Sequence, residues 1–138
     1  MKSLFKTICI ASDHAGYNLK ESIKAFLISK SVSIIDLGPN KNSSVDYPDY
    51  AKKVSKRVNS KKSDLGILIC GSGTGMAISA NKTKGIRAAV CYNLKSTRLS
   101  RQHNDANIIA LGSRLTKKNL SLKLVSTFIK TEFEGGRH

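Results

Sequence analysis

The sequence predicts a single α/β domain over residues 1–138, built around a parallel sheet. Two observations carry this prediction. Short apolar runs rich in β-branched residues are nearly continuous rather than alternating, which is typical of parallel strands covered on both faces. These runs alternate along the chain with segments whose apolar residues recur at helical spacing. The 138 residues fit one compact domain, and a hydrophobic content of 40% is enough for a core.

Five apolar runs are predicted to be the strands. They are residues 7–12, 32–37, 65–70, 86–92 and 107–111. The stretches between and after them are predicted to be helices, and three of these stretches carry a clear apolar stripe. The stripes consist of Leu19, Ile23, Phe26 and Leu27, then Tyr47, Tyr50, Val54 and Val58, and finally Leu120, Leu124 and Phe128.

Residues with known positional preferences support these helices. Asp46 is predicted to cap the second helix, with Pro48 in its first turn, and Thr116 to cap the last one. Gly85 is predicted to end the short helix that follows a glycine-rich turn. The five βα units that result predict a Rossmann-like three-layer αβα sandwich with a five-stranded parallel sheet.

The net charge of +15 raises the question of an anionic partner, either a nucleic acid or a small anionic substrate. The lysines are scattered over the polar sides of the predicted helices, and no aromatic residues interleave with them as a single-strand stacking surface would need. A solvated surface is therefore the favoured interpretation, with no nucleic-acid partner. A nucleic-acid-binding protein stays a distant alternative.

The cysteines and the first residues indicate a cytoplasmic protein. The three cysteines form neither a disulfide framework nor a zinc-finger pattern, and Cys9 and Cys91 lie in apolar runs where a buried, inert thiol is expected. No apolar run reaches eighteen residues, so no membrane partner is expected. The start of the chain is not interpreted as a signal peptide, because charged residues from Lys6 onward interrupt any apolar stretch.

Polar and glycine-rich segments follow three of the predicted strands. They are residues 12–16 (SDHAG), 70–75 (CGSGTG) and 112–114 (GSR). In an open parallel sheet, ligands bind beyond the carboxyl ends of the strands. We therefore expect these three segments to share one edge of the fold.

The glycine turn of residues 70–75 has two interpretations of similar weight, an anion cradle made of backbone N–H groups or a tight connection from strand to helix. Its G-x-G-x-G spacing matches neither the dinucleotide fingerprint nor a Walker A loop. Cys70, directly before the turn, favours a site, because nearby N–H groups and a helix N-terminus stabilise a thiolate.

The other polar segments are ordinary when each is taken alone. Asp13 could cap a helix beside a surface His14, and His103 could complement the end of a helix. The three histidines of the sequence have no metal-ligand spacing, and no nucleophile-elbow serine is present, so no metal or other cofactor is expected.

Taken together, the segments resemble the type B ribose-5-phosphate isomerases, of the wider family that includes galactose-6-phosphate isomerase subunits. The matching pieces run in family order over nearly the whole chain. They are SDHAG at 12–16, DYP at 46–48, ICGSGTG at 69–75, ANK at 80–82, GIRA at 85–88, RQHN at 101–104, GSR at 112–114 and EGGRH at 134–138.

The resemblance implies that D-ribose 5-phosphate and D-ribulose 5-phosphate are interconverted through an enediolate, in the non-oxidative pentose phosphate pathway. It implies that Cys70 is the base, that the glycine-turn N–H groups stabilise the enediolate oxygen, and that Ser72 helps to pass a proton between the sugar oxygens. It further implies that His103 opens the furanose ring with Asp13 as its partner. The implied substrate-binding residues are Asp13, His14, Tyr47, Gly71, Ser72, Gly73, Thr74, Gly75, Asn104, Arg114 and Arg137.

The resemblance also implies a homodimer or homotetramer with active sites shared between chains. His103, Asn104 and Arg114 would then come from the partner of the chain that supplies Cys70. An isomerase of a six-carbon sugar phosphate, allose 6-phosphate or galactose 6-phosphate, is the alternative. Because this chain holds both the Cys70 turn and the RQHN segment, a self-sufficient homo-oligomer is favoured over a chain that shares its motifs with a second protein.

Two features depart from the family pattern. Ser72 stands where threonine is common, which keeps the hydroxyl, so we expect function to be retained. The sequence also ends at His138, whereas relatives usually place a second arginine four positions beyond the one that Arg137 matches. Since a hydrogen bond to a charged group contributes about 1.5–3 kcal/mol, we expect phosphate affinity to fall about tenfold or more.

Overall fold

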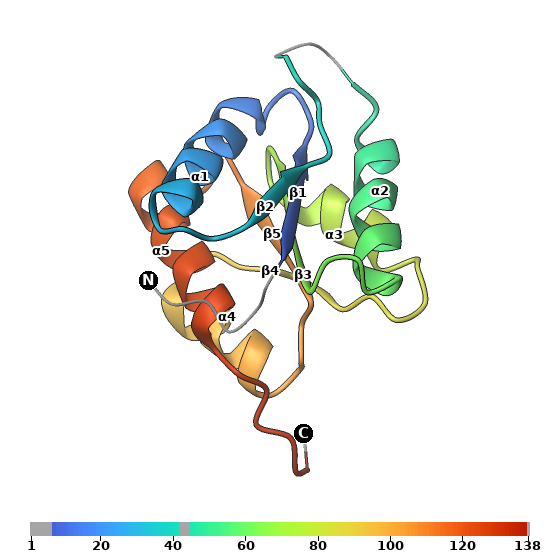
Figure 1. Ribbon diagram of the computed structural model, residues 1–138, viewed down its shortest axis with the longest axis vertical. Coiled ribbons are helices and arrows are strands. Elements are labelled where there is room, and N and C mark those ends of the chain that lie inside the picture. The colour runs from blue at the N-terminus through green and yellow to red at the C-terminus, as the bar shows by residue number, and fades with distance from the viewer. Residues whose placement is uncertain (1–6, 42–44, 138) are drawn as a thin grey trace.

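Five strands and five helices alternate along the chain in the computed structural model, which describes residues 7–41 and 45–137 (Figure 1). The strands are β1 (Ile8–Ser12), β2 (Ile34–Asp36), β3 (Leu65–Cys70), β4 (Ala88–Val90) and β5 (Ile108–Gly112). The helices are α1 (Tyr17–Ser29), α2 (Tyr47–Asn59), α3 (Thr74–Ala80), α4 (Leu94–Gln102) and α5 (Lys118–Lys130). The predicted α/β class and the five βα units are confirmed.

All strand pairs are parallel, and the order across the sheet is β2-β1-β3-β5-β4. The helices lie on both sides of the sheet, with α1 and α5 on one face and α2 and α3 on the other, as Figure 1 shows. Helix α4 packs against α5. The chain leaves β1 toward β2 and returns to place β3 on the opposite side of β1. This reversal makes the β1/β3 boundary the topological switch point of the sheet, where ligands bind in open α/β folds.

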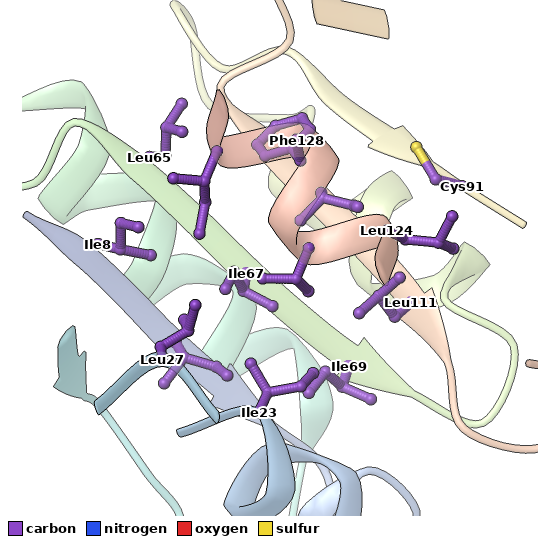
Figure 2. Packing of buried hydrophobic residues seen from close by; sticks show 14 of the residues in the cluster. Ile8, Ile23, Leu27, Leu65, Ile67, Ile69, Cys91, Leu111, Leu124 and Phe128 are labelled. Carbon is purple, nitrogen blue, oxygen red and sulfur yellow. The ribbon is translucent and has the colours of Figure 1, made fainter. Parts of the chain in front are cut away.

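The core consists of two apolar layers, one on each face of the sheet. The larger layer joins alternate residues of β1 and β3, such as Ile8, Ile67 and Ile69, to residues of α1 and α5, among them Phe128 (Figure 2). The smaller layer joins the opposite faces of the same strands to α2 and α3. Both faces of β3 are buried, which explains why its sequence is apolar without alternation.

Strands β1, β3 and β5 match their predicted ranges within one residue, whereas the two edge strands are shorter than predicted. Strand β2 was expected over residues 32–37 and covers Ile34–Asp36, and β4 was expected over residues 86–92 and covers Ala88–Val90. Each edge strand pairs with a neighbour on one side alone, so its ends leave the sheet sooner. Because β4 ends at Val90, Tyr92 lies in the loop that follows it.

Two of the predicted helix boundaries are wrong. Thr116 does not cap α5, which begins at Lys118 after the N-cap residue Lys117; within the described part of the chain, the buried Thr116 hydroxyl has no hydrogen-bond partner. Gly85 does not end α3, which stops at Ala80. The amide of Asn81 instead exchanges two hydrogen bonds, of 2.7 and 3.0 Å, with the backbone of Ala88.

The start of α2 is as predicted in position. Asp46 is the N-cap residue and Pro48 lies in the first turn. The cap is made by the backbone, because the Asp49 N–H donates to the Asp46 carbonyl oxygen at 3.2 Å while the Asp46 carboxylate makes no capping hydrogen bond. In residues 7–41 and 45–137, no helix combines the length and the apolar character that a membrane crossing requires.

A cluster of charged residues ties α1 to the end of β2. The Lys20 ammonium, whose side chain is fully buried, donates to Asp36 Oδ2 at 2.6 Å and to Glu21 at 3.0 Å, and Lys24 reaches the same Asp36 oxygen at 2.7 Å. Burial disfavours the charged form of Asp36, but hydrogen bonds from Lys20 and Lys24 outweigh it and hold the pKa of this carboxyl below its usual range. Asp36 Oδ1 also accepts the Gly38 N–H at 2.8 Å.

Candidate active site

The loops that follow β1, β3 and β5 meet at the carboxyl edge of the sheet, as predicted. The Asp13 N–H donates to the Ile69 carbonyl oxygen at 3.1 Å, which joins the β1 loop to the end of β3. The Ser113 N–H donates to the Cys70 carbonyl oxygen at 2.9 Å, and the Ser113 hydroxyl donates to the Ala15 carbonyl oxygen at 2.7 Å. Two backbone hydrogen bonds and one from the Ser113 hydroxyl therefore hold the three loops together beside the switch point.

A cavity of about 360 Å³ opens between these loops. Seven of the predicted site residues, together with a leucine that was not predicted, form its lining. The lining residues are Asp13, Tyr47, Cys70, Gly71, Ser72, Gly75, Arg114 and Leu115. The volume suits a small polar metabolite.

Cys70 is the last residue of β3, and its side chain faces the turn that follows. The residue is 6% exposed, and the Gly73 N–H donates to its Sγ atom at 3.1 Å. Gly73 has a φ of +82°, a left-handed conformation that glycine adopts without steric cost. An N–H donor aimed at sulfur gives a hydrogen bond to negative charge on that atom, and a thiolate is the form of cysteine that accepts a proton.

Two N–H groups of the predicted anion cradle have partners inside the turn. That of Gly73 points to Cys70 Sγ, and that of Thr74 donates to Ser72 Oγ at 3.2 Å. The Ser72 hydroxyl is exposed at the cavity, where it keeps its own proton to donate. The turn therefore presents a sulfur and a hydroxyl to the same small space.

Asp13 and His14 lie on the β1–α1 loop but face different surroundings. Asp13 lines the cavity, and its Oδ1 atom accepts the Gly16 N–H at 2.9 Å, so the carboxylate also fixes its own loop. His14 is exposed and lies beside the cavity rather than in its lining. Helix α1 begins at Tyr17 with Gly16 as its N-cap residue, so the alternative interpretation of Asp13 as the helix cap is wrong. Its place in the cavity lining agrees with the interpretation as a site residue.

Tyr47 and Arg114 both line the cavity, and each lies against a different glycine of the turn. The Tyr47 ring lies over Gly75, where a β-carbon would be 3.2 Å from the ring, and the Arg114 guanidinium lies over Gly71, where a β-carbon would be 2.8 Å from Nη1. The resemblance implied that Arg114 reaches Cys70 from a partner chain, whereas within one chain Arg114 already lines the Cys70 cavity. Strand β5 pairs directly with β3, so the β5 loop brings Arg114 to the Cys70 cavity of the same chain.

His103, Asn104 and Arg137 lie away from this cavity. Helix α4 runs back from the carboxyl end of β4 to the amino end of β5, and His103 is its C-cap residue. The five residues of β5 separate the two edges of the sheet by about 16 Å, at about 3.3 Å per residue. Figure 1 shows α4 and the segment of residues 131–137 at the end of the molecule opposite the β1–α1 loop.

The segment around His103 is held in place by its neighbours. The buried Arg101 donates from Nη1 to the Ala106 carbonyl oxygen at 2.6 Å and from Nε to the Thr131 carbonyl oxygen at 3.0 Å. The His103 side chain is 40% exposed, and its Nε2 atom lies 3.7 Å from Glu134 Oε1. Arg101 thus supports the α4 terminus, and it leaves the imidazole at the surface. His138, the last residue of the matched EGGRH segment, lies outside the described residues.

The remaining cysteines are buried and free, as predicted. Burial raises the pKa of both the Cys9 and the Cys91 thiols above the ordinary value. Across residues 7–41 and 45–137, no group of three or more metal-ligating side chains is present.

Sequence reasoning missed two residues at this edge. Leu115 lines the cavity, and Tyr92 donates from its hydroxyl to the Ser72 carbonyl oxygen at 3.0 Å. Leu115 follows the matched GSR segment directly, and Tyr92 follows a strand. Ligands bind beyond the carboxyl ends of parallel strands, so this rule applied to the right strand ends would have predicted both residues. Tyr92 was instead assigned to the end of the fourth strand.

Comparison with known proteins identifies the family. A family model described as Ribose/Galactose Isomerase matches residues 8–138. Ribose-5-phosphate isomerase B of Escherichia coli is 45% identical over 133 residues, which cover 96% of this chain and 89% of that protein. The structure of ribose-5-phosphate isomerase B from Clostridium thermocellum matches with a TM-score of 0.94 and 54% identity, over 96% of this chain and 89% of that one. The Mycoplasma genitalium enzyme with bound ribulose-5-phosphate matches with a TM-score of 0.92 and 46% identity, over 96% of this chain and 88% of that one. The chain therefore belongs to the ribose/galactose isomerase family.

Proposed function

We propose that this protein interconverts D-ribose 5-phosphate and D-ribulose 5-phosphate, with Cys70 as the base. One observation carries the proposal: the Cys70 sulfur, with an N–H donor at 3.1 Å, borders a cavity beside the switch point of the sheet that Asp13 and Arg114 also line. The similarity to ribose-5-phosphate isomerases B supports the substrate. We place the activity in the cytoplasm, in the non-oxidative pentose phosphate pathway.

In the proposed reaction, the Cys70 thiolate removes the C2 proton of the open-chain aldose, and the electron pair moves through C1 to the aldehyde oxygen. The resulting enediolate receives the proton back from the Cys70 thiol at C1, while the O2 proton moves to O1 and leaves the ketone. The Ser72 hydroxyl, at the same cavity, carries the proton between the two oxygens. Stabilisation of the enediolate charge falls to the N–H groups of the turn other than those of Gly73 and Thr74.

The cavity also offers a place for the phosphate. The Arg114 guanidinium forms one wall, and the exposed His14 lies on the adjoining loop. A guanidinium binds phosphate oxygens in a bidentate manner, so Arg114 is the principal phosphate ligand in this proposal. Tyr47 covers the sugar, and Asp13 assists the opening of the ring.

A second copy of the chain supplies the ring-opening acid. His103 lies at the edge of the sheet opposite Cys70 in the same chain, and a strand length of about 16 Å exceeds the reach of a histidine. We therefore propose that His103, Asn104 and Arg137 act in the cavity of a partner chain. The protein would then be a homodimer or a pair of dimers.

Ketose formation from ribose 5-phosphate tests the function. The purified protein should turn over, and Cys70→Ala should lose at least about 10³-fold in kcat because the base is removed. Cys91→Ala is the matched control, since Cys91 is buried in the core and should leave kcat unchanged. Equal rates from wild type and Cys70→Ala would remove Cys70 from the mechanism.

The same assay should include allose 6-phosphate and galactose 6-phosphate, because the family description covers galactose isomerases as well. If kcat/KM on either of these sugars exceeds that on ribose 5-phosphate, that sugar is the preferred substrate and the proposed one is wrong. No turnover on any of the three, together with salt-sensitive retention of DNA, would instead favour a nucleic-acid-binding protein.

A further inference from the structure

We propose that Tyr92 is a positioning residue that holds the Gly73 N–H on the Cys70 sulfur. The inference rests on the proposed role of Cys70 as the base. Tyr92 lies in the loop between β4 and α4, two residues beyond the end of β4, and is 41% exposed. Its hydroxyl donates to the Ser72 carbonyl oxygen at 3.0 Å, across twenty residues of sequence.

The geometry of the peptide unit links this hydrogen bond to the sulfur. The Ser72 carbonyl and the Gly73 N–H belong to one planar trans peptide, so they point in opposite directions. Tyr92 holds the carbonyl end at 3.0 Å, and Cys70 Sγ accepts from the N–H end at 3.1 Å. Any rotation of this peptide lengthens both hydrogen bonds together. The Tyr92 hydroxyl therefore determines where the N–H points.

The backbone behind the turn restricts the same peptide from a third side. A β-carbon on Gly112, at the end of β5, would lie 2.7 Å from the Ser72 carbonyl oxygen, and one on Gly73 would lie 3.0 Å from the Leu111 carbonyl carbon. The backbone of the turn therefore lies close to that of β5, which leaves little room for movement toward the sheet. Movement away from the sheet is opposed by the Tyr92 hydrogen bond, so the hydroxyl supplies the restraint that the packing lacks.

Without the hydroxyl, the peptide gains freedom to rotate and the N–H donates to sulfur for a smaller part of the time. The sulfur then loses part of the hydrogen bond that would stabilise a negative charge on it. The other titratable or charged groups at the cavity are Asp13, Tyr47 and Arg114, with His14 on the adjoining loop, and a change of Tyr92 to phenylalanine leaves all of them in place. The chemical effect of this change is thus confined to the turn.

Tyr92→Phe removes the hydroxyl alone, and the test uses two readouts. In the first, Cys70 of the intact protein is alkylated with iodoacetamide from pH 5 to 10 and followed by mass spectrometry of its peptide. We expect alkylation at neutral pH to slow by about threefold to tenfold, the effect of one lost hydrogen bond, with an unchanged plateau at high pH. In the second, kcat for ribose 5-phosphate at neutral pH should fall by a similar factor while KM stays within about twofold.

Tyr17→Phe is the matched control, because the Tyr17 hydroxyl also donates to a backbone carbonyl, that of Asn40, at 3.1 Å. It should reproduce the wild-type alkylation profile and kcat. An alkylation profile of Tyr92→Phe that coincides with wild type, or one that is lowered at every pH including the plateau, would overturn the inference. The alkylation profile needs no turnover, so a failure of the proposed isomerase activity is recognised separately, by a wild type that is inactive or by an active Cys70→Ala.

Discussion

Mixing two inactive variants tests whether the active site is shared between chains. Cys70→Ala removes the proposed base, and His103→Ala removes the proposed ring-opening acid. The homo-oligomer of each variant should therefore be inactive, because all of its sites lack the same group. If each site takes Cys70 from one chain and His103 from the other, a heterodimer of the two variants contains one intact site and one site that lacks both groups. Activity should therefore return on mixing.

The positions of the two residues require two chains, and random pairing of the chains sets the size of the recovered activity. Cys70 ends β3 at the carboxyl edge of the sheet, and His103 caps α4 at the amino edge, about 16 Å away by the length of β5. No rotation of side chains closes this gap within one chain. Random reassociation of equal amounts makes half of the dimers mixed, and half of the sites in those dimers are intact. The expected recovery is about one quarter of the wild-type kcat, for dimers and for pairs of dimers alike.

The assay is ketose formation after the two variants have been unfolded and refolded together. Cys70→Ala refolded with the double variant Cys70→Ala, His103→Ala is the control, and it should stay inactive because no combination restores both groups. Differently tagged copies would verify that mixed oligomers form. Mixed oligomers without recovered activity would refute the shared site, and a His103→Ala protein with full activity would refute the role of His103.

Three further predictions concern stability and the turn. Asp36→Asn should lower the free energy of unfolding by about 3 kcal/mol at pH 7, because the buried Lys20 loses its principal partner. Since the pKa of Asp36 is lowered on folding, the stability that this carboxylate contributes is present above the unfolded pKa of about 3.9 and is lost as the pH falls below it. Urea unfolding should therefore give a smaller difference in stability between wild type and Asp36→Asn at pH 3 than at pH 7. Phe128→Ala should cost about 3–5 kcal/mol in the same measurement, and a loss below about 1 kcal/mol would contradict its place in the core. Gly112→Ala places a β-carbon 2.7 Å from the Ser72 carbonyl oxygen and should lower kcat by about 10- to 100-fold; unchanged kcat would show that the turn tolerates displacement.

The sequence predicted best where the chain is buried on both sides. Strands β1, β3 and β5 are flanked by neighbours and covered by helices, so their apolar runs coincide with their ends within one residue. The edge strands β2 and β4 were predicted too long, because apolar residues near an edge also pack on helices after the strand has ended. Because β4 was predicted to extend to residue 92, Tyr92 was not considered as a residue of the site. It lies in the loop after β4 and donates a hydrogen bond to the glycine turn.

By itself, the sequence determined the fold class, and it predicted the edge of the sheet at which the cavity lies and the presence of Cys70 at that edge. These depend on local patterns, namely apolar runs, helical stripes and glycines after strands, which act over a few residues. The tertiary structure alone decided which side chains share a cavity: it placed Arg114 with Cys70 in one chain, because β5 pairs with β3, and put His103 at the opposite edge, because a crossover helix must run back along the sheet. Distances across the sheet depend on the order of the strands and the direction of the helices. Neither can be predicted from any single segment of the chain.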